Sequence, residues 1–275
     1  MRETLEKGQF ALMNPLISWT ALSDGWTSAP EGAVLIGGSW MKRIRFHAIA
    51  FLLRHPTEGN VLVDTGYSTR FWEETRRFPN RIYRHLTKVS LTDPRGIAGQ
   101  LSSLGIDPAE IQHLVITHFH ADHIGGLRDF PAAKLYAAET AWESVRNLRG
   151  FRALKQAFLP GLLPEDITER LRFVKEGSDL FGDGSIQILD LPGHAPGQIG
   201  LRFLDDTARP VLLAADAAWL SDAFRENRMP HPLTKFLNDW EPYRATLQRL
   251  HDLYRKEPDL LILPTHCPET AAFLK

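Results

Sequence analysis

Residues 117–123 limit the possible folds of this chain more than any other stretch, because three histidines and one aspartate occupy six successive positions there. They follow the apolar run 111–116, so we expect a buried strand that ends in a turn at these polar residues. On an extended chain, side chains two positions apart point to the same side. The side chains expected on the shared side are His118, His120 and Asp122. His123 would then turn away from them, and this division predicts two metal ions rather than one.

Two more histidines and two more aspartates stand after apolar, strand-like runs: Asp64, His194, Asp216 and His266. Groups at one end of several strands converge in an open sheet, so these residues could form one site. Asp64 by itself is typical of a turn after a strand, and beside a metal site it is a candidate to orient a ligand histidine. The other histidines lack this context, and we do not expect them to bind metal: His47, His55, His85, His113, His231 and His251.

Direction and ligand type divide the predicted ligands between two ions. The first ion is expected to bind His118, His120 and His194, and the second Asp122, His123 and His266, with Asp216 as the bridge. Imidazole and carboxylate ligands without thiolate favour Zn²⁺ and also permit Fe, Mn or Co. Three protein nitrogens leave a position open for water, which is typical of a catalytic site.

This predicted site suits hydrolysis. Two divalent ions about 3.5–4 Å apart can share a hydroxide that forms at neutral pH. The same ions can polarise a carbonyl and hold the leaving oxygen, so cleavage of an ester, lactone, thioester or phosphoester fits the electrostatics. The predicted catalytic residues are Asp216, as the bridging ligand, and Asp122, whose free oxygen could shuttle a proton. The sequence therefore predicts a metal-dependent hydrolase.

Periodicity and turn residues predict a mixture of strands and helices. The expected strands are residues 33–36, 44–53, 61–63, 111–117, 134–137, 198–204, 211–215 and 260–263, with a hairpin turn at 182–184. The expected helices are residues 93–104, 139–148 and 240–254. No repeat or linker divides the chain, so we expect one domain over residues 1–275.

Two irregular segments allow two interpretations each. Residues 67–90 combine aromatic side chains with arginines, and they form either an amphipathic surface segment or a flap over the substrate. Residues 150–172 are rich in Phe and Leu around Pro and Gly. They form either short helices that complete the core or an apolar lid, and the interruptions by Pro and Gly favour the lid.

Charge and cysteine content narrow the partners and the compartment. The net charge of −1 lacks the basic field that nucleic-acid binding needs, so we expect no nucleic-acid partner. Cys267 is the only cysteine, which excludes an internal disulfide and favours a reducing, cytoplasmic location. The sequence shows no secretory signal and no apolar run near the roughly 20 residues of a membrane span. The expected partner is a small molecule with an apolar part. The sequence neither requires nor excludes a homodimer.

Taken together, these motifs resemble those of the metallo-β-lactamase-fold hydrolases. The matching motifs are Asp64-Thr65-Gly66, Thr117-His118-Phe119-His120-Ala121-Asp122-His123, Pro192-Gly193-His194, Asp216 and Pro264-Thr265-His266. The resemblance covers about residues 45–267. It implies an α/β (α+β) fold, namely a four-layer αβ/βα sandwich of two central sheets with helices outside and a dinuclear site at one edge. It also implies the ligand roles given above.

Within this superfamily, the Asp122–His123 pair and Asp216 are more similar to lactonases, glyoxalase II and phosphodiesterases than to antibiotic-degrading β-lactamases. The chain has no helical domain after His266 of the kind that glyoxalase II carries, which counts against that branch. Length and motif order resemble the N-acyl-homoserine lactonases, the quorum-quenching enzymes. We therefore expect cleavage of a small ester or lactone, with an N-acyl-homoserine lactone as an example. The alternatives are a phosphoester, suggested by the arginines of residues 67–90, and a low-turnover ligand sensor.

One position departs from the lactonase pattern. Those enzymes usually carry a tyrosine three residues after the bridging aspartate, where this chain has Trp219. An indole N–H donates a hydrogen bond but cannot supply a proton as a phenol can. Tyr67 is the candidate to replace that phenol. The residues predicted to contact the substrate are Tyr67, Phe71, Trp72, Tyr83, Phe158 and Trp219.

Overall fold

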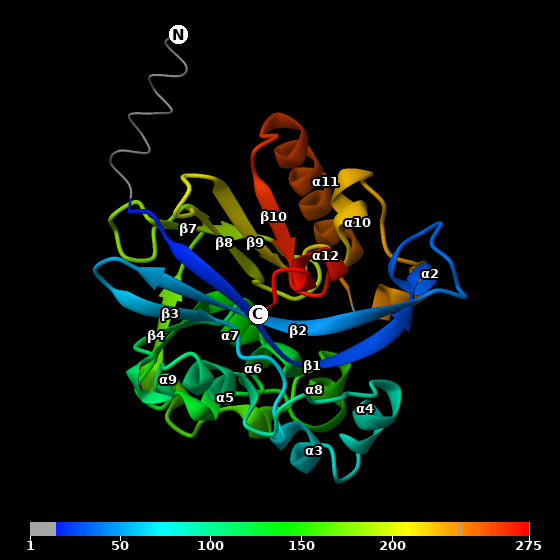
Figure 1. The fold of residues 1–275 in the computed structure, drawn as a ribbon. Coiled ribbons are helices and arrows are strands. Elements are labelled where there is room, and N and C mark those ends of the chain that lie inside the picture. The colour runs from blue at the N-terminus through cyan, green and yellow to red at the C-terminus, as the bar shows by residue number, and fades with distance from the viewer. Residues whose placement is uncertain (1–14, 237, 275) are drawn as a thin grey trace.

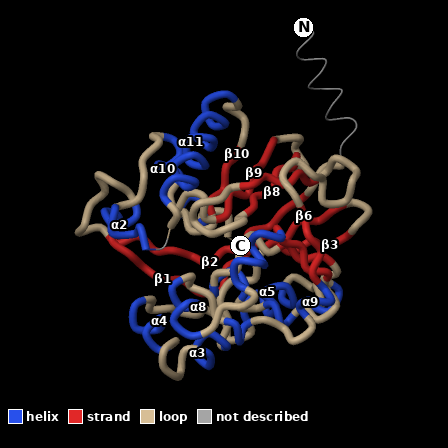
Figure 2. Tube along the Cα trace, turned by 180° about the vertical axis from the view of Figure 1, so that it is seen from behind, coloured by secondary structure: helices blue, strands red, loops and turns tan. Residues whose placement is uncertain are grey.

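Two β-sheets face each other between outer layers of helices in the computed structural model, which describes residues 15–236 and 238–274 (Figure 1). The cyan and green helices lie below one sheet, and the gold and orange helices cover the other. Figure 2 shows the same order of layers from behind. The predicted four-layer α/β sandwich is therefore confirmed.

The larger sheet has six strands, whose order follows the chain from β1 to β6. The first three strands pair antiparallel, and β3, β4, β5 and β6 pair parallel. The paired parts of β3 and β4, Val61–Val63 and His113–Val115, are buried, as is typical of parallel strands that are covered on both faces. The strands are β1 Ser18–Pro30, β2 Arg43–His55, β3 Gly59–Val63, β4 His113–Val115, β5 Lys134–Ala138 and β6 Leu171–Val174.

The smaller sheet has four strands in the order β10, β9, β8, β7. Only the β10–β9 pair is parallel. Successive side chains of β9 point to opposite faces of the sheet: Leu212 and Ala214 pack toward the helices outside, whereas Val211 and Leu213 pack toward the other sheet. The strands are β7 Ile186–Asp190, β8 Ile199–Leu204, β9 Pro210–Ala215 and β10 Leu261–Pro264.

The helices are short except for α11, which runs for 17 residues. Its buried residues Tyr243, Leu247 and Leu250 follow helical spacing and pack on the smaller sheet. The α-helices are α2 Glu31–Val34, α3 Arg70–Glu74, α4 Arg81–Leu86, α5 Gly96–Ser103, α6 Ala121–Ile124, α7 Glu139–Val145, α8 Gly150–Lys155, α9 Ile167–Arg170, α10 Ser221–Arg225, α11 Trp240–Lys256 and α12 Pro268–Ala271. The 3₁₀ helices are η1 Pro108–Glu110, η2 Leu127–Asp129, η3 Pro160–Leu162 and η4 Pro232–Phe236.

Most of the predicted elements are confirmed within a few residues, including the long helix at 240–254 and the strands on either side of it. The turn at residues 182–184 is also confirmed, since Asp179 and Gln187 pair antiparallel around it. The strand expected at residues 33–36 is wrong. Residues Glu31–Val34 form α2, in which the Leu35 N–H bonds to the Glu31 carbonyl at 2.9 Å. This turn joins the two long strands β1 and β2, whose pairing ends at Pro30 and Arg43.

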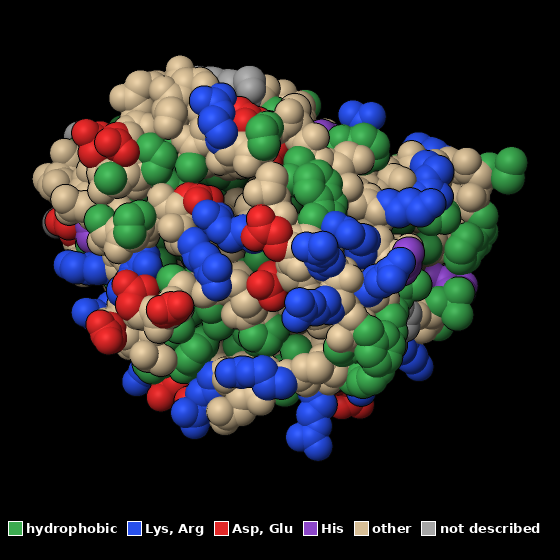
Figure 3. Space-filling view, turned by 90° about the horizontal axis from the view of Figure 1, so that it is seen from below, with side chains coloured by type: hydrophobic (Ala, Val, Ile, Leu, Met, Phe, Trp, Pro, Cys, Tyr) green, Lys and Arg blue, Asp and Glu red, His purple; other side chains and the backbone are tan. Residues whose placement is uncertain are grey.

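The apolar lid favoured for residues 150–172 is wrong. Phe158, Leu159 and Leu162 are fully buried in the main core, and the segment forms α8, η3 and α9. The alternative, short helices that complete the core, is the arrangement found. Residues 67–90 likewise form two short helices, α3 and α4, which bury Phe71 and Tyr83 against the same core. Figure 3 shows this lower face of the molecule, where Lys and Arg side chains are exposed and acidic side chains gather on the left.

In the part of the chain that the structure describes, no helix combines the length and the apolar character needed to cross a membrane. The single domain over residues 1–275 stays a prediction, and residues 1–14 of it lie outside the described residues.

Candidate metal centre

The predicted ligands lie where strands end. Asp64 follows β3, and His118 comes three residues after the end of β4. In the other sheet, Asp216 follows β9 and His266 comes two residues after β10. His194 stands in the loop after β7. Because the two sheets face each other, these strand ends bring residues that are distant in the sequence to one edge of the sandwich.

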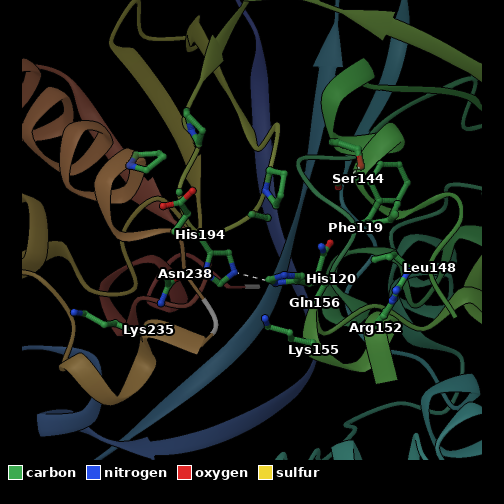
Figure 4. A pocket seen from close by; sticks show the side chains of 18 residues that line it. Phe119, His120, Ser144, Leu148, Arg152, Lys155, Gln156, His194, Lys235 and Asn238 are labelled. Atoms are coloured by element: carbon green, nitrogen blue, oxygen red, sulfur yellow. Dashed lines mark hydrogen bonds between the residues drawn. The ribbon is translucent and has the colours of Figure 1, made fainter. Parts of the chain in front are cut away.

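One group of donors consists of His118, His120 and His194, whose ligand atoms lie within 4.8 Å of one another. The His120 Nδ1 and His194 Nε2 atoms are 2.9 Å apart, as the dashed line in Figure 4 marks. The ring of His118 lies edge-on to both, with centroids 4.5 Å from His120 and 5.1 Å from His194. These are the three residues predicted to bind the first ion.

A second group with the same spacing consists of Asp122, His123 and His266. The His266 Nε2 atom lies 3.3 Å from Asp122 Oδ2, and the His123 Nε2 atom lies 3.8 Å from the same oxygen. Asp122 and His123 belong to the helical turn α6, so the extended chain assumed from the sequence ends at His120. The helical turn places His123 between the two groups, with its ring centroid 4.0 Å from that of His118 and 5.8 Å from that of His266.

Asp216 lies between the two groups. Its Oδ2 atom is 3.2 Å from His194 Nε2 and 3.0 Å from His266 Nε2, and its Oδ1 atom is 3.4 Å from His123 Nε2. The preceding residue, Ala215, has a φ of +47°, a strained conformation for a residue with a side chain. This conformation turns the chain at the end of β9 and directs the carboxylate into the site. The structure thus brings all seven predicted ligands together.

Asp64 links the end of β3 to the segment that follows the neighbouring strand β4. Its Oδ1 atom accepts a hydrogen bond from the Thr117 N–H at 2.9 Å, and its Oδ2 atom accepts one from the Thr117 hydroxyl at 2.7 Å. The Oδ2 atom also lies 2.8 Å from His123 Nδ1. Asp64 itself has a φ of +60°, which fits a short polar residue that bonds to its neighbours. The carboxylate therefore orients the imidazole of His123, the role expected from the sequence.

Other partners hold the imidazoles of His194 and His266 by the nitrogen that faces away from the site. The His194 Nδ1 atom is 3.0 Å from Asn238 Oδ1, and the His266 Nδ1 atom is 2.7 Å from the His47 carbonyl. Such bonds fix the tautomer, so that the second ring nitrogen carries a free lone pair toward a metal. Asn238 was not predicted from the sequence, because one asparagine in an irregular segment carries no recognisable signal.

Several site atoms have no hydrogen-bond partner among the described residues: His118 Nε2, His123 Nε2 and Asp216 Oδ1. All three are buried, and their residues form a third group whose ligand atoms lie within 4.8 Å of one another. Buried polar atoms normally find a partner, because leaving them unpaired costs free energy. A divalent ion would satisfy these atoms together, so the donor set fits a metal.

The pKa values divide the histidines of the site into two kinds. Burial lowers the pKa of His120 to about 3 and holds the pKa of His118 well below its ordinary value. Both rings are therefore neutral and able to bind a metal at neutral pH. Burial also disfavours the charge on His266, but Asp216 and Asp122 outweigh it and raise the pKa to about 10. A metal ion bound there would displace this proton, since an imidazole ligand must be neutral.

The two site carboxylates stay ionised. Burial opposes the charge of Asp122, but His123 and His266 outweigh it and lower the pKa to about 2. Burial likewise opposes the charge of Asp216, and His266, His123 and His194 hold its pKa well below the ordinary value. Two buried negative charges at one point need positive charge nearby, which divalent cations supply.

A cavity of about 530 Å³ opens beside His120 and His194 (Figure 4). One wall is formed by α7, α8 and Phe119, and the other by residues 192–196 with Lys235, Asn238, Asp239 and Pro242. Apolar side chains such as Val145 and Leu148 line much of it. The cations among its lining residues are Arg152, Lys155 and Lys235. None of the residues Val145, Leu148, Arg152, Lys155 and Lys235 was predicted as a substrate contact, because their positions at the cavity depend on how distant segments pack.

The residues predicted to contact the substrate lie around the site but not on this cavity. Trp219 packs edge-on against His194, with ring centroids 5.6 Å apart. Tyr67 and Tyr83 are buried near the site acids: burial first, and then Asp122 and Asp216, hold the pKa values of both phenols well above the ordinary value. Phe71 and Phe158 are buried in the core and Trp72 packs against it, so the structure does not place them at the cavity.

Residues 45–266 match the family model of the metallo-beta-lactamase superfamily. The chain belongs to this superfamily, and it is a metal-dependent hydrolase with the fold of that family. The ligand-sensor alternative is therefore set aside.

Similar proteins include lactonases. An N-acyl homoserine lactonase of Rhizobium radiobacter is 27% identical over 238 residues, which cover 82% of this chain and 83% of the relative. A probable metallo-hydrolase of Mycobacterium tuberculosis is 30% identical over 79% of this chain and 74% of its own length. Among solved structures, a Bacillus thuringiensis protein with N-decanoyl-L-homoserine bound at its active site has a TM-score of 0.73 at 21% identity, covering 96% of this chain and 98% of that one. A dizinc quorum-quenching lactonase has a TM-score of 0.66 at 17% identity, covering 92% and 88%.

Proposed function

We propose that the chain hydrolyses a small lactone or ester with an apolar part, using two divalent metal ions. The observation that carries this proposal is the joint position of three buried donor groups beside a cavity with apolar walls. His118, His120 and His194 would hold one ion, Asp122, His123 and His266 would hold the other, and Asp216 would reach both. The relatives named as N-acyl homoserine lactonases support a lactone as the substrate.

When bound, two such ions lower the pKa of water and polarise a carbonyl, and Zn²⁺ suits these nitrogen and oxygen donors. The chain's own contribution is to fix the donors and to move protons. Asp122 is the more exposed of the two site carboxylates, with 13% of its side chain accessible against 3% for Asp216. Its low pKa keeps the Asp122 carboxylate ionised at neutral pH, so it would be free to take up a proton in the reaction and pass it to the leaving oxygen.

The cavity walls would orient the substrate. Phe119, Val145 and Leu148 offer apolar surface for an acyl or alkyl part, next to the His120 and His194 nitrogens. Burying an apolar chain there would favour binding by roughly 25 cal/mol for each Å² removed from water. Binding along these walls would place the scissile carbonyl at the metal centre and exclude bulk water from it.

A phosphoester is the second candidate, and the cations in the cavity wall favour it. The arginines of residues 67–90, which first suggested it, support it less. Arg70 pairs with Asp129 through two bonds of 2.9 Å and 2.6 Å, and Arg84 donates to the Trp72 carbonyl at 3.1 Å. The support for a phosphoester comes instead from three cations that line the cavity beside the site, Arg152, Lys155 and Lys235.

The test is a substrate panel on the Zn²⁺-loaded protein, with a lactone, an aryl ester, a thioester and an aryl phosphodiester. We expect the lactone or the ester to turn over fastest. His118→Ala and Asp216→Ala should each lower kcat/KM by at least about a thousandfold, because each removes a donor from the reacting centre. His85→Ala, which changes an exposed histidine on α4, is the matched control. Strong phosphodiester cleavage without lactone or ester opening would reverse the ranking.

A further inference from the structure

The cations that line the cavity beside the metal centre have a charge that the proposed lactone or ester chemistry does not use. They come from two separate parts of the chain: Arg152 and Lys155 stand three residues apart on α8, and Lys235 belongs to η4. Figure 4 shows Lys235 to the left of His194, and Lys155 and Arg152 below and to the right of His120. The opening of the cavity is thus flanked by cations on both sides.

These charges are not neutralised locally. In the part of the chain that the structure describes, none of the three cations forms an ion pair, whereas neighbouring arginines do, such as Arg146 with Glu143. Lys235 instead lies over the ring of Trp240, 4.7 Å from its centroid. Asp239 is the one acidic residue among the described residues that line the cavity, so three cations face one anion there. The wall carries a net positive charge although the whole chain has a net charge of −1.

We propose that the cavity recognises a substrate that carries an anionic group, a carboxylate or a phosphate, on the part of the molecule that is not cleaved. The proposal rests on the proposed function and specifies its substrate class. The scissile carbonyl must reach the metal centre that His120 and His194 would help to hold, so the three cations bind the opposite end of the molecule. Between the two ends, the apolar side chains of α7 and Phe119 take up the intervening hydrocarbon.

The exposure of the cations determines how strong this recognition is. Arg152, Lys155 and Lys235 are exposed, with stems that cover apolar surface and charged ends in water. One exposed pair contributes little, because solvent and salt screen it. Three cations around one opening add their fields, which attract an anion more strongly and select it over a neutral analogue. The selection should weaken as the salt concentration rises.

The experiment compares two lactones that differ only in terminal charge: N-adipoyl-homoserine lactone, which ends in a carboxylate, and N-hexanoyl-homoserine lactone, which is neutral. We expect the wild-type protein to favour the anionic lactone in kcat/KM by about tenfold at low salt. In the Arg152→Gln/Lys155→Gln/Lys235→Gln variant this ratio should fall to about one. Lys134→Gln is the matched control, because Lys134 is exposed at the start of β5 and does not line the cavity.

Equal rates for the two lactones in the wild-type protein, or a ratio that the triple variant keeps, would overturn the proposal. If neither lactone opened, the proposed function and not the recognition of charge would be at fault. Calorimetric binding of the same two lactones to the metal-loaded protein would then decide. Tighter binding of the anionic lactone by the wild-type protein than by the triple variant would support the proposal, and equal affinities would contradict it.

Discussion

Three of the site imidazoles have one ring nitrogen that faces the donor groups and another that faces a partner in the fold, namely His123, His194 and His266. Asn238 is such a partner for His194, and its own amide donates to the Thr234 carbonyl at 3.0 Å. The same short segment contributes Lys235 to the cavity wall. This one segment therefore both orients a predicted metal ligand and lines the cavity.

Replacing Asn238 with alanine should weaken metal binding at the first ion. The change leaves His194 free to rotate and to change tautomer, and loss of such a partner typically costs 10- to 100-fold in metal affinity or activity. Zn²⁺ affinity by competition with a chelating dye measures this directly. Gln156→Ala is the control, because Gln156 lines the opposite wall of the cavity. An unchanged Zn²⁺ affinity of Asn238→Ala would show that the hydrogen bond between Asn238 and His194 does not contribute to metal binding.

Single residues differ in how well the sequence predicts them. The seven proposed ligands were found because imidazoles and carboxylates after strand-like runs have few structural explanations. Asn238 and Lys155 carry no such signal, since asparagine and lysine are common on any surface. For Phe158 the sequence predicted a role that the residue does not have. Its aromatic ring suggested a substrate contact, but the structure buries it in the core.

At the level of elements, the loop after β7 carries His194 and packs directly on α11. Gly193 has a φ of +126°, and a Cβ atom there would lie 2.2 Å from the backbone of Tyr243. No side chain fits without a backbone shift. The close approach of loop and helix is therefore part of how His194 reaches the site.

Gly193→Ala should lower the free energy of unfolding by about 2–4 kcal/mol, from the strained φ and the clash together. It should also reduce metal content, because His194 moves with the loop. Urea denaturation and elemental analysis measure the two effects. Gly177→Ala is the matched control: Gly177 also has a positive φ, +73°, but nothing lies within 4 Å of its missing Cβ. If both variants lost the same free energy of unfolding, the destabilisation would come from the positive φ alone and not from a clash with Tyr243.

Asp24 of β1 links that strand to the loop before α5. It is fully buried, and its Oδ1 atom accepts hydrogen bonds from the Thr92 and Asp93 N–H groups at 3.1 Å and 2.9 Å. Burial raises the pKa of this carboxyl, although those two bonds oppose the shift. Because the folded chain binds this proton more tightly than the unfolded chain, Asp24 makes the fold less stable as pH rises from the ordinary Asp value through the raised one.

Asp24→Asn should therefore be more stable than the wild-type protein at pH 7, since an amide oxygen can still accept the two N–H bonds without a buried charge. The difference should shrink as the pH falls toward 4. Urea unfolding at several pH values measures it. A variant that is less stable than the wild-type protein at pH 7, or a difference that does not change with pH, would refute this account of Asp24.

The elements also show where periodicity is informative. The sequence predicted the strand at 211–215 and the helix at 240–254, which the structure has as β9 and α11. Residues 33–36 are apolar enough for a strand, but hydrogen bonds to Glu31 and the pairing of β1 with β2 make them part of a turn. Residues 150–172 mix core residues and cavity residues in one segment, a division that depends on contacts far along the chain.

At the scale of the whole molecule, the predicted site joins the two sheets. Asp64 and residues 117–123 come from one sheet, and His194, Asp216 and His266 come from the other. Ions held between them would link the two halves of the sandwich. Metal binding should therefore stabilise the entire fold and not only the site.

Removing metal with a chelator should lower Tm by about 10 °C. An ion present at a thousandfold excess over its Kd contributes about 4 kcal/mol, and 1 kcal/mol corresponds to about 2–4 °C in chains of this size. Scanning calorimetry measures the shift. Adding Zn²⁺ should restore Tm, whereas Mg²⁺, which prefers oxygen ligands, should not. An unchanged Tm after verified metal loss would mean that no ion links the sheets.

The most direct measurement is a Zn²⁺ titration of the metal-free protein with bound metal and lactone or ester turnover recorded at each step. The seven donors predict two ions per chain, with turnover complete when the second has bound. Asp216→Ala, which removes the carboxylate between the groups, should bind metal more weakly and lose turnover. One ion or none at saturation, or full turnover by the metal-free protein, would contradict a dinuclear hydrolytic centre.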